Sequence, residues 1–487
     1  MSVANLLIPA IRWDAERGWD ASRPAIERAL ALGVGGFILF GGEQDAVRQL
    51  TKELRLRSTV PLLIAADMER GAGQQFAGAT GLPPLAAIAS LNDPDLVRRA
   101  ARLTAREART LGVNWDFAPV CDVDLAPDNP VLGTRTFGGD ASRVAAMAAV
   151  WIKACQGEGV LACAKHFPGH GRTHGDSHLE LPVVDAQRSE LLEVDVQPFR
   201  AAVEAGVSSI MTAHVAYPAL DPSGAPATTS REILQWLLRR ELHFDGLVVS
   251  DSLVMKGALA GRDESAAAIA AINAGCDVLL YPSDVETLAA RLTQAVETRA
   301  LNEEHVRNAL RRRLKWAQWA SPPNEYRRPS ASDLAWGAQL AERVVRMVRG
   351  ARPVIASPLD VVVIDDDLGG PTPAPSRAPF LDALTRAGFR AQRVPEPSGD
   401  PSRTTLIALF GETQPWKGRA GYSDAARSAV ERTCAMAPTA LLVQFGHPRL
   451  IRELPSARSI VTAWSGDGAM QVAAAKWLGG AGAGSGA

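Results

Sequence analysis

The chain has 487 residues, of which 47% are hydrophobic and 22% charged, and its formal net charge is −1. This length exceeds one ordinary domain, and the composition is typical of a globular chain with a large apolar core. The balanced charge provides no basic field for nucleic acid and no polybasic segment for a membrane surface.

The N-terminus and the cysteines indicate the compartment in which the protein is expected. Residues 1–13 lack a basic region followed by a long apolar run, and no apolar stretch approaches the roughly 20 residues that cross a bilayer. The five cysteines are scattered, and no pair has zinc-ligand spacing. We therefore expect a cytoplasmic protein with buried, reduced thiols, no metal or other cofactor, and neither nucleic-acid nor membrane partners. Nothing in the sequence fixes the oligomeric state.

Short apolar runs alternate with longer helical patterns from the start of the chain. This alternation predicts parallel strands joined by right-handed helical crossovers. Eight such units fit a (β/α)8 barrel of roughly 250 residues plus insertions. The alternative is a doubly wound open sheet, but no G-x-G-x-x-G follows the first strand, which disfavours its dinucleotide-binding form. The predicted strands are residues 6–11, 35–40, 61–67, 113–120, 160–166, 209–214, 246–251 and 277–281.

Polar side chains stand at or just past the ends of five predicted strands. They are Asp67, Asp122, His166, His214 and Asp251. A single polar residue there is often only a helix cap. Five of them on the carboxyl face, where barrel enzymes place their chemistry, indicate an active site.

A second α/β pattern follows a proline-rich, charged segment at 321–332. We predict a barrel over 1–320, a linker and a helix (333–349) within 321–356, and a smaller α/β sandwich-type domain over 357–487. Its predicted strands are 360–364, 405–410, 440–445 and 459–464. Glu412, near the end of one strand, is expected to be a solvated surface residue.

Four of the eight histidines fall in the segment KHFPGHGRTHGDSH. Their spacing of four resembles metal ligands on a helix, but Pro168, Gly169, Gly171 and Gly175 forbid a helix there. The pattern therefore predicts a long glycine-rich loop leaving the fifth strand. A metal site built from the loop, or chance clustering of exposed histidines, are the alternatives.

The segment KHFPGHG followed by Asp176-Ser-His178 resembles the signature of bacterial β-N-acetylhexosaminidases of glycoside hydrolase family 3. Other segments resemble the family's markers in the same order along the first roughly 300 residues, the length of a barrel domain with insertions. They are NWDFAPVCDVD (114–124), GTRTFGGD (133–140), MTAHVAYP (211–218) and GLVVSDSLVMKGA (246–258).

The resemblance implies a role for each matching position. Asp251 matches the nucleophile, and His178 with Asp176 matches an acid/base dyad in which histidine replaces the usual carboxylic acid. The unperturbed pKa of histidine, about 6.5, suits such a role near neutral pH. The expected substrate-binding residues are Asp67, Arg135, Lys165, His166 and His214.

The third-strand segment departs from the family's pattern. Ala72 and Gln75 stand where the family usually has arginines, and Arg70 aligns with neither. Glu69 and Arg70 could form ion pairs with neighbouring charges, and we assign them no role. Asp122 and Asp124 resemble a D-x-D metal motif, although alternation in an extended strand explains that spacing more simply.

The sequence thus predicts a retaining hydrolase that removes β-linked N-acetylglucosamine from cell-wall or chitin-derived fragments, as in peptidoglycan recycling. Its partner is expected to be a small carbohydrate substrate. A β-glucosidase or a glycoside phosphorylase is the alternative within enzymes, because a histidine acid leaves less negative charge to repel phosphate. A catalytically silent sugar-binding protein is the remaining alternative, and it would not need Asp251, Asp176 and His178.

Overall fold

A computed structural model of the chain describes residues 2–320, 328–367 and 374–480. Part of the predicted linker (321–327) and most of the glycine-rich tail (481–487) lie outside the described residues. The chain divides into two compact units. The first comprises Met1–Thr80, Asp93–Leu125 and Thr136–Asp333, and the second comprises Gly81–Asn92, Ala126–Arg135 and Leu334–Ala487. The domain boundaries near 320 and 357 remain a prediction.

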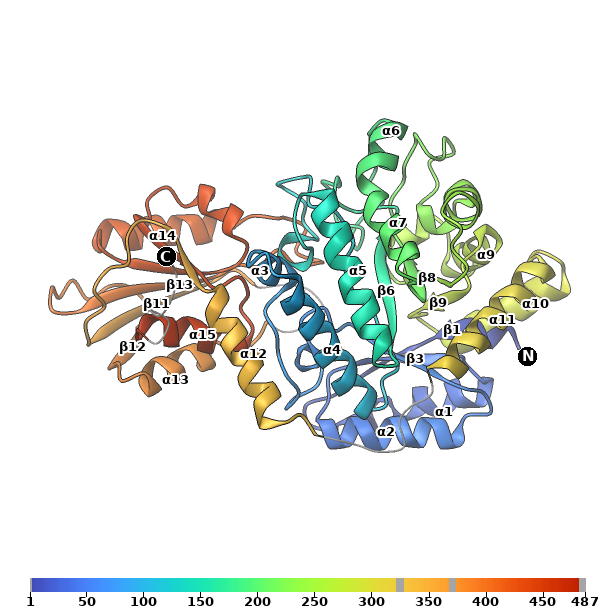
Figure 1. Ribbon diagram of the computed structural model, residues 1–487, viewed down its shortest axis with the longest axis horizontal. Helices are drawn as coiled ribbons and strands as arrows, with labels where there is room; N and C mark the ends of the chain where they lie inside the picture. Colours follow the sequence, from blue (N-terminus) through green and yellow to red (C-terminus); the bar gives the residue numbers. More distant parts are fainter. Residues whose placement is uncertain (1, 321–327, 368–373, 481–487) are drawn as a thin grey trace. The chain divides into compact units, whose positions relative to one another are not determined.

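The first unit contains a parallel sheet in the order β1-β9-β8-β7-β6-β5-β4-β3-β2 (Figure 1). β1 and β2 are two halves of one strand, which is interrupted at Pro9 because proline has no N–H to donate. One half pairs with β9 and the other with β3, so the sheet closes into a barrel. The strands are β1 (Leu7–Ile8), β2 (Ala10–Arg12), β3 (Gly36–Phe40), β4 (Leu63–Ala66), β5 (Trp115–Asp116), β6 (Leu161–Phe167), β7 (Ser209–Thr212), β8 (Leu247–Ser252) and β9 (Val278–Leu280).

Helices connect these strands and pack around the outside of the barrel (Figure 1). They are α1 (Arg23–Leu32), α2 (Gln44–Arg57), α4 (Pro94–Thr110), α5 (Ala141–Gly157), α6 (Arg188–Glu190), α7 (Gln197–Glu204), the π-helix η7 (Glu232–Glu241), α8 (Lys256–Leu259), α9 (Glu264–Ala274), α10 (Val285–Glu297) and α11 (Glu303–Trp319). All eight predicted strands are present, and the predicted barrel is confirmed. Several strands are shorter than predicted. The fourth, for example, is reduced to Trp115–Asp116.

The second unit contains a six-stranded sheet in the order β10-β15-β14-β13-β11-β12. Its strands are parallel except for the antiparallel pair β10 and β15. The strands are β10 (Arg346–Arg349), β11 (Leu359–Asp365), β12 (Ala391–Val394), β13 (Thr404–Phe410), β14 (Leu441–Phe445) and β15 (Ser459–Thr462), and the helices are α3 (Leu85–Ala89), α12 (Ala331–Val344), α13 (Ala378–Arg386), α14 (Asp424–Met436) and α15 (Gly468–Leu478).

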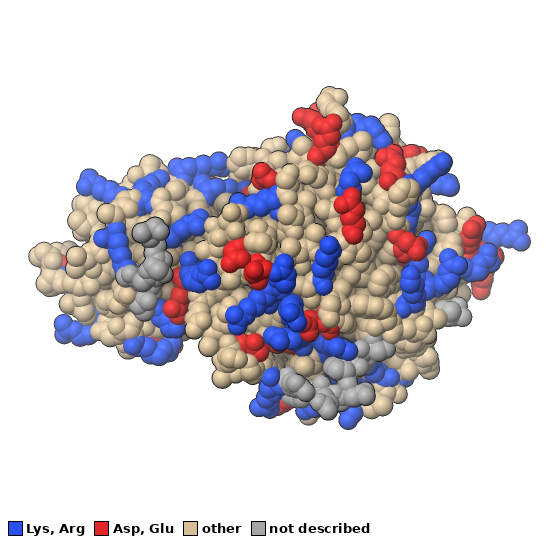
Figure 2. Space-filling model, in the orientation of Figure 1, with Lys and Arg blue, Asp and Glu red and all other residues tan. Residues whose placement is uncertain are grey.

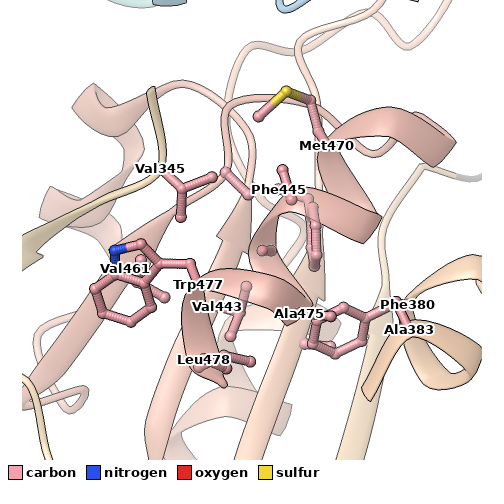
Figure 3. Packing of buried hydrophobic residues seen from close by; sticks show 14 of the residues in the cluster. Val345, Phe380, Ala383, Val443, Phe445, Val461, Met470, Ala475, Trp477 and Leu478 are labelled. Carbon is pink, nitrogen blue, oxygen red and sulfur yellow. The ribbon is translucent and has the colours of Figure 1, made fainter. Parts of the chain in front are cut away.

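Helices cover both faces of this sheet. Figure 3 shows Phe380 of α13 and Trp477 of α15 in the cluster that also contains Val443, Phe445 and Val461 of the sheet. α14 covers the opposite face with a second apolar cluster. The predicted smaller α/β domain of sandwich type is therefore confirmed.

Two sequence-based expectations for this unit are wrong, and one strand was not predicted. The helix predicted over 333–349 ends at Val344, and Arg346–Arg349 instead forms the edge strand β10, which pairs with β15. The edge strand β12 was not predicted, because its outward-facing residues are polar. Glu412 is only 8% exposed, and it accepts a hydrogen bond from the Gly466 amide.

The surface and the cysteines agree with a globular protein. Figure 2 shows Lys and Arg side chains interspersed with Asp and Glu side chains around the helices of the first unit, in keeping with the net charge of −1. All five cysteines are buried and free. In the part of the chain that the structure describes, no helix is both long enough and apolar enough to cross a bilayer.

Candidate active site

The inward-facing residues of the barrel form layers, and the candidate site is the layer at the carboxyl ends of the strands. Ala65, Cys163 and Val249 belong to the apolar interior of the barrel. Because side chains alternate along a strand, the residues two positions further also point inward. Those residues are Asp67, Lys165 and Asp251, which are three of the predicted site residues.

Asp251, the predicted nucleophile, is a carboxylate with three histidines around it. Its side chain is 23% exposed, and its Oδ2 lies 3.9 Å from His166 Nε2. Burial alone would raise the pKa of Asp251, but the charges of His166, His214 and His178 and a hydrogen bond from the Ser252 amide lower it to about 2. The side chain is therefore ionised at neutral pH, as a nucleophile must be.

His166 is held against Asp251 by a buried carboxylate, Asp122. The Nδ1 of His166 lies 2.7 Å from Asp122 Oδ2, and the amides of His166 and His170 donate to Asp122 Oδ1 over 3.1 and 2.6 Å. Burial opposes the charge of Asp122, yet these imidazoles and hydrogen bonds lower its pKa below the ordinary value. Asp122 thus fixes both the ring orientation of His166 and the start of the histidine-rich loop.

Lys165 lies between two carboxylates. Its side chain is 2% exposed, and its Nζ lies 2.8 Å from Asp67 Oδ1 and 2.7 Å from Glu69 Oε1. The two carboxylates hold the ammonium group of Lys165 in one place. The Asp67 side chain is 27% exposed, so part of it remains accessible. The arrangement can present both a donor and an acceptor to the hydroxyls of a sugar.

His214, from the segment after β7, contacts the strand that carries Asp251. Its Nδ1 lies 2.7 Å from Thr228 Oγ1, and its Nε2 lies 3.2 Å from the Ser252 carbonyl oxygen. Burial lowers the pKa of His214. The ring is therefore fixed beside the strand that carries the proposed nucleophile.

The predicted contact between His178 and Asp176 is present. The Nδ1 of His178 lies 2.7 Å from Asp176 Oδ1, and the His178 amide donates to the same oxygen over 2.9 Å. Asp176 is buried, whereas the His178 side chain is 16% exposed. Because an ionised carboxylate only accepts hydrogen bonds, the Nδ1 of His178 carries the hydrogen of this contact.

Two sets of contacts hold this loop near the nucleophile strand. The Nε2 of His170 lies 3.0 Å from Ser177 Oγ, and burial lowers the pKa of His170 to about 4. The amides of Gly257 and Lys256, just beyond β8, donate to the carbonyls of Ser177 and His178 over 3.0 and 3.4 Å. Ser177, the residue before His178, is thus connected both to His170 near the start of the loop and to the segment that follows Asp251.

Arg135 belongs to the segment Ala126–Arg135, which clusters with the second unit. Within that unit, Arg449 and Arg452 donate to the carbonyls of Asn129 and Pro127. The predicted contact of Arg135 with the sugar remains a prediction.

Gln75 and Ala72 stand where the family usually has arginines, and the structure shows what surrounds each of them. The Nε2 of Gln75 donates to the Asp67 carbonyl over 3.1 Å, and its Oε1 accepts from the Gly41 amide over 3.3 Å. Ala72 is fully buried. Gln75 therefore holds the backbone that carries Asp67, although it brings no charge to the site.

Sequence reasoning placed Asp122 at the carboxyl face but gave it no role, and it left Glu69 without a role beyond a possible ion pair. Asp122 contacts His166 and Glu69 contacts Lys165 directly. The available signal was position, because both lie near strand ends that also carry predicted site residues. Within the described residues, no group of three or more His, Cys, Asp or Glu side chains is arranged to hold a metal ion. A hollow of about 700 Å³ lies between α9 and α10 and includes none of the site residues.

Comparison with known proteins gives the family. Residues 17–315 match the glycosyl hydrolase family 3 N-terminal domain. The chain is 35% identical over 395 residues to a β-N-acetylglucosaminidase/β-glucosidase of Cellulomonas fimi, which covers 76% of this chain and 70% of that protein. It is 37% identical over 262 residues to a β-hexosaminidase of Idiomarina loihiensis, which covers 52% of this chain and 78% of that protein. A glycoside hydrolase family 3 β-N-acetylglucosaminidase from a Paenibacillus species has a similar structure, with a TM-score of 0.83 at 26% identity over 98% of this chain and 96% of that one. The chain therefore belongs to glycosyl hydrolase family 3 and is a glycoside hydrolase.

Proposed function

We propose that this glycoside hydrolase is a retaining β-N-acetylhexosaminidase that removes β-linked N-acetylglucosamine from cell-wall or chitin-derived fragments. The names of the similar proteins from Cellulomonas, Idiomarina and Paenibacillus support this substrate class. A cytoplasmic setting and a part in peptidoglycan recycling remain predictions.

In the proposed first step, Asp251 attacks the anomeric carbon while His178 donates the Nε2 proton to the glycosidic oxygen. The bond from C1 to that oxygen breaks, a covalent glycosyl–Asp251 ester forms, and the aglycone leaves as an alcohol. Asp176 holds Nδ1–H of the imidazole, so the ring is oriented whichever protonation state Nε2 adopts.

In the second step, neutral His178 accepts a proton from water as the water oxygen attacks C1. The ester breaks, Asp251 is regenerated as a carboxylate, and the sugar leaves with its original anomeric configuration. Asp67, Lys165 and His166 would hold the ring hydroxyls during both steps. His214 lies close enough to Asp251 to help retain the carboxylate in its charged form.

The dyad is the observation that carries this proposal. A His178–Asp176 pair at 2.7 Å, on a loop bonded to the segment that follows Asp251, supports an acid and a nucleophile serving one bond. A protein that only binds sugar gains nothing from such a pair.

The test is turnover of nitrophenyl N-acetyl-β-glucosaminide, compared with nitrophenyl β-glucoside. Trapping with a 2-deoxy-2-fluoro or 5-fluoro glycoside should place the label on Asp251. His178→Ala should lose about 10²–10⁴-fold in kcat/KM on N,N′-diacetylchitobiose and far less on a dinitrophenyl glycoside, whose leaving group needs no proton. His305→Ala, on the outer helix α11, is the matched control and should change neither. Absence of turnover by the folded wild type, or a label on another side chain, would overturn the proposal.

Phosphorolysis or β-glucosidase activity is the second candidate. The double name of the Cellulomonas relative favours testing both sugars. A histidine acid leaves less negative charge near the acceptor than a glutamate would. Phosphate dependence of the rate, with a sugar 1-phosphate as product, would identify a phosphorylase.

A further inference from the structure

Arg12 is the last residue of β2 and occupies the same inward-facing layer as the proposed catalytic residues. It stands two residues beyond Ala10, which packs against the barrel interior, as Asp251 stands two residues beyond Val249. Its register partner is Phe40, the last residue of β3. Arg12 therefore belongs to the carboxyl face of the barrel.

The strand order places Arg12 on the arc of the barrel between Asp251 and Asp67. β8 is followed around the barrel by β9, the β1–β2 strand, β3 and β4. The ends of the three intervening strands carry Tyr281, Arg12 and Phe40. These side chains thus line the stretch of rim opposite Lys165 and His166 on β6.

The guanidinium of Arg12 is held in place by two aromatic rings. Its Nε donates to the Tyr281 hydroxyl over 2.9 Å. Its Cζ lies 4.2 Å from the ring centroid of Phe40 and 5.3 Å from that of Tyr281. Both rings also pack on the apolar interior of the barrel. One face of the guanidinium and its Nε are therefore occupied by these contacts. The Nη1 and Nη2 groups can bind other partners.

Among residues 2–320, 328–367 and 374–480, Arg12 has no carboxylate within ion-pair distance and no acceptor for Nη1 or Nη2. Lys165, in the same layer, has two carboxylates. A guanidinium is charged at every accessible pH, and its paired Nη groups match the two oxygens of a carboxylate or phosphate. Arg12 is thus a fixed cation without a counter-ion at the face where substrate binds.

We propose that Arg12 is a specificity-determining residue that binds an oxyanion beside the sugar. The oxyanion is either a carboxylate carried by the sugar or inorganic phosphate, since both present the same pair of oxygens. This inference rests on the proposed function, because it takes the carboxyl face of the barrel as the sugar site. Tyr281 acts as a positioning residue that fixes the guanidinium through Nε.

The experiment is isothermal titration of the full-length protein with inorganic phosphate, glucuronate and glucose, at constant ionic strength maintained with chloride. Binding requires no turnover, so a failure of the proposed hydrolysis would not affect the result. The variants are Arg12→Met, Arg12→Lys and Tyr281→Phe, and Arg307→Met on the exposed face of α11 is the matched control. Circular dichroism and thermal melting establish that each variant is folded.

We expect wild type to bind phosphate, or to bind glucuronate more tightly than glucose. Arg12→Met should weaken that oxyanion binding by about tenfold to a hundredfold, the usual effect of losing charged hydrogen bonds. Arg12→Lys should recover only part of it, because an ammonium lacks the paired geometry, and Tyr281→Phe should show a smaller loss. If Arg12→Met weakens only the binding of phosphate, the ligand is a free oxyanion. If it weakens only the binding of glucuronate, the ligand is a carboxylate on the sugar. The inference is overturned if wild type shows no preference for either oxyanion, or if Arg12→Met changes their binding no more than that of glucose.

Discussion

Gly257 lies where three backbone carbonyls converge, and Gly257→Ala should separate the acid loop from the nucleophile strand without altering either functional side chain. A Cβ at this position would stand 2.7 Å from the His214 carbonyl oxygen and 2.9 Å from those of Ser177 and Glu180. Ser177 and Glu180 flank the proposed acid, His178. Backbone atoms cannot rotate away as side chains do, so the loop must move.

The required movement can be read from those distances. Reaching ordinary contact at 3.4 Å requires shifts of 0.5–0.7 Å, and the hydrogen bond from the Gly257 amide to the Ser177 carbonyl must lengthen with them. Misplacement of about 1 Å in an active site costs about 10²-fold in rate. We therefore expect Gly257→Ala to lower kcat/KM for N,N′-diacetylchitobiose by roughly 10- to 100-fold.

The assay compares that substrate with a dinitrophenyl N-acetyl-β-glucosaminide. The activated substrate should lose less than about threefold, since its leaving group needs little help from a general acid. Gly157→Ala is the control, because an added Cβ at the end of α5 meets nothing within 4 Å. Equal losses on both substrates, or no loss on either, would refute the view that Gly257 positions the acid loop.

Three further substitutions test side-chain contacts that stabilise the two units. Asp122→Asn removes the charge that orients His166 and should reduce stability by about 2 kcal/mol while lowering kcat/KM, as measured by thermal melts and kinetics. The pKa of His170 is lowered to about 4, so the folded state binds a proton less readily than the unfolded one, and stability is lost as pH falls from about 6.5 to about 4. His170→Asn should reduce that loss by up to about 3 kcal/mol, seen as a smaller fall in melting temperature between pH 7 and pH 4.5 than in wild type. In the second unit, Asp366→Ala should cost about 3 kcal/mol, because it removes the nearer of two carboxylates beside the buried Lys417 and the acceptor of Arg419 and Ser423, and differential scanning calorimetry would detect this loss.

The barrel could be predicted because its signal is local. Each strand is a short apolar run, and it is followed by a segment whose apolar residues recur at helical spacing. Each inward-facing polar residue falls at the end of such a run. The two elements missed in the second unit, β10 and β12, are edge strands. An edge strand faces solvent on one side and needs fewer apolar residues, so its pattern resembles a loop or the end of a helix.

The site could be predicted only as far as its residues match a known motif. Asp251, Asp176 and His178 were named from the motif, and the His178–Asp176 contact also follows from their spacing. Asp122 was placed at the site by its position near a strand end, but its contact with His166, 44 residues further along the chain, could not be predicted. The orphan cation Arg12 follows from the strand order around the barrel, which no local pattern reveals.

The three histidines around Asp251 share one construction. In each of His166, His178 and His214, Nδ1 contacts a fixed oxygen, and the Nε2 of His214 also contacts the Ser252 carbonyl oxygen. Two of these oxygens belong to the carboxylates Asp122 and Asp176, and the third is the hydroxyl oxygen of Thr228. The orientation of each ring is therefore fixed through its Nδ1. His166 belongs to β6 and His214 lies two residues past β7, whereas His178 lies on the long loop that follows β6. The proposed acid/base is thus the ring furthest from a strand along the chain, so the contacts of Ser177 with His170 and Gly257 are what hold it near the segment that follows Asp251.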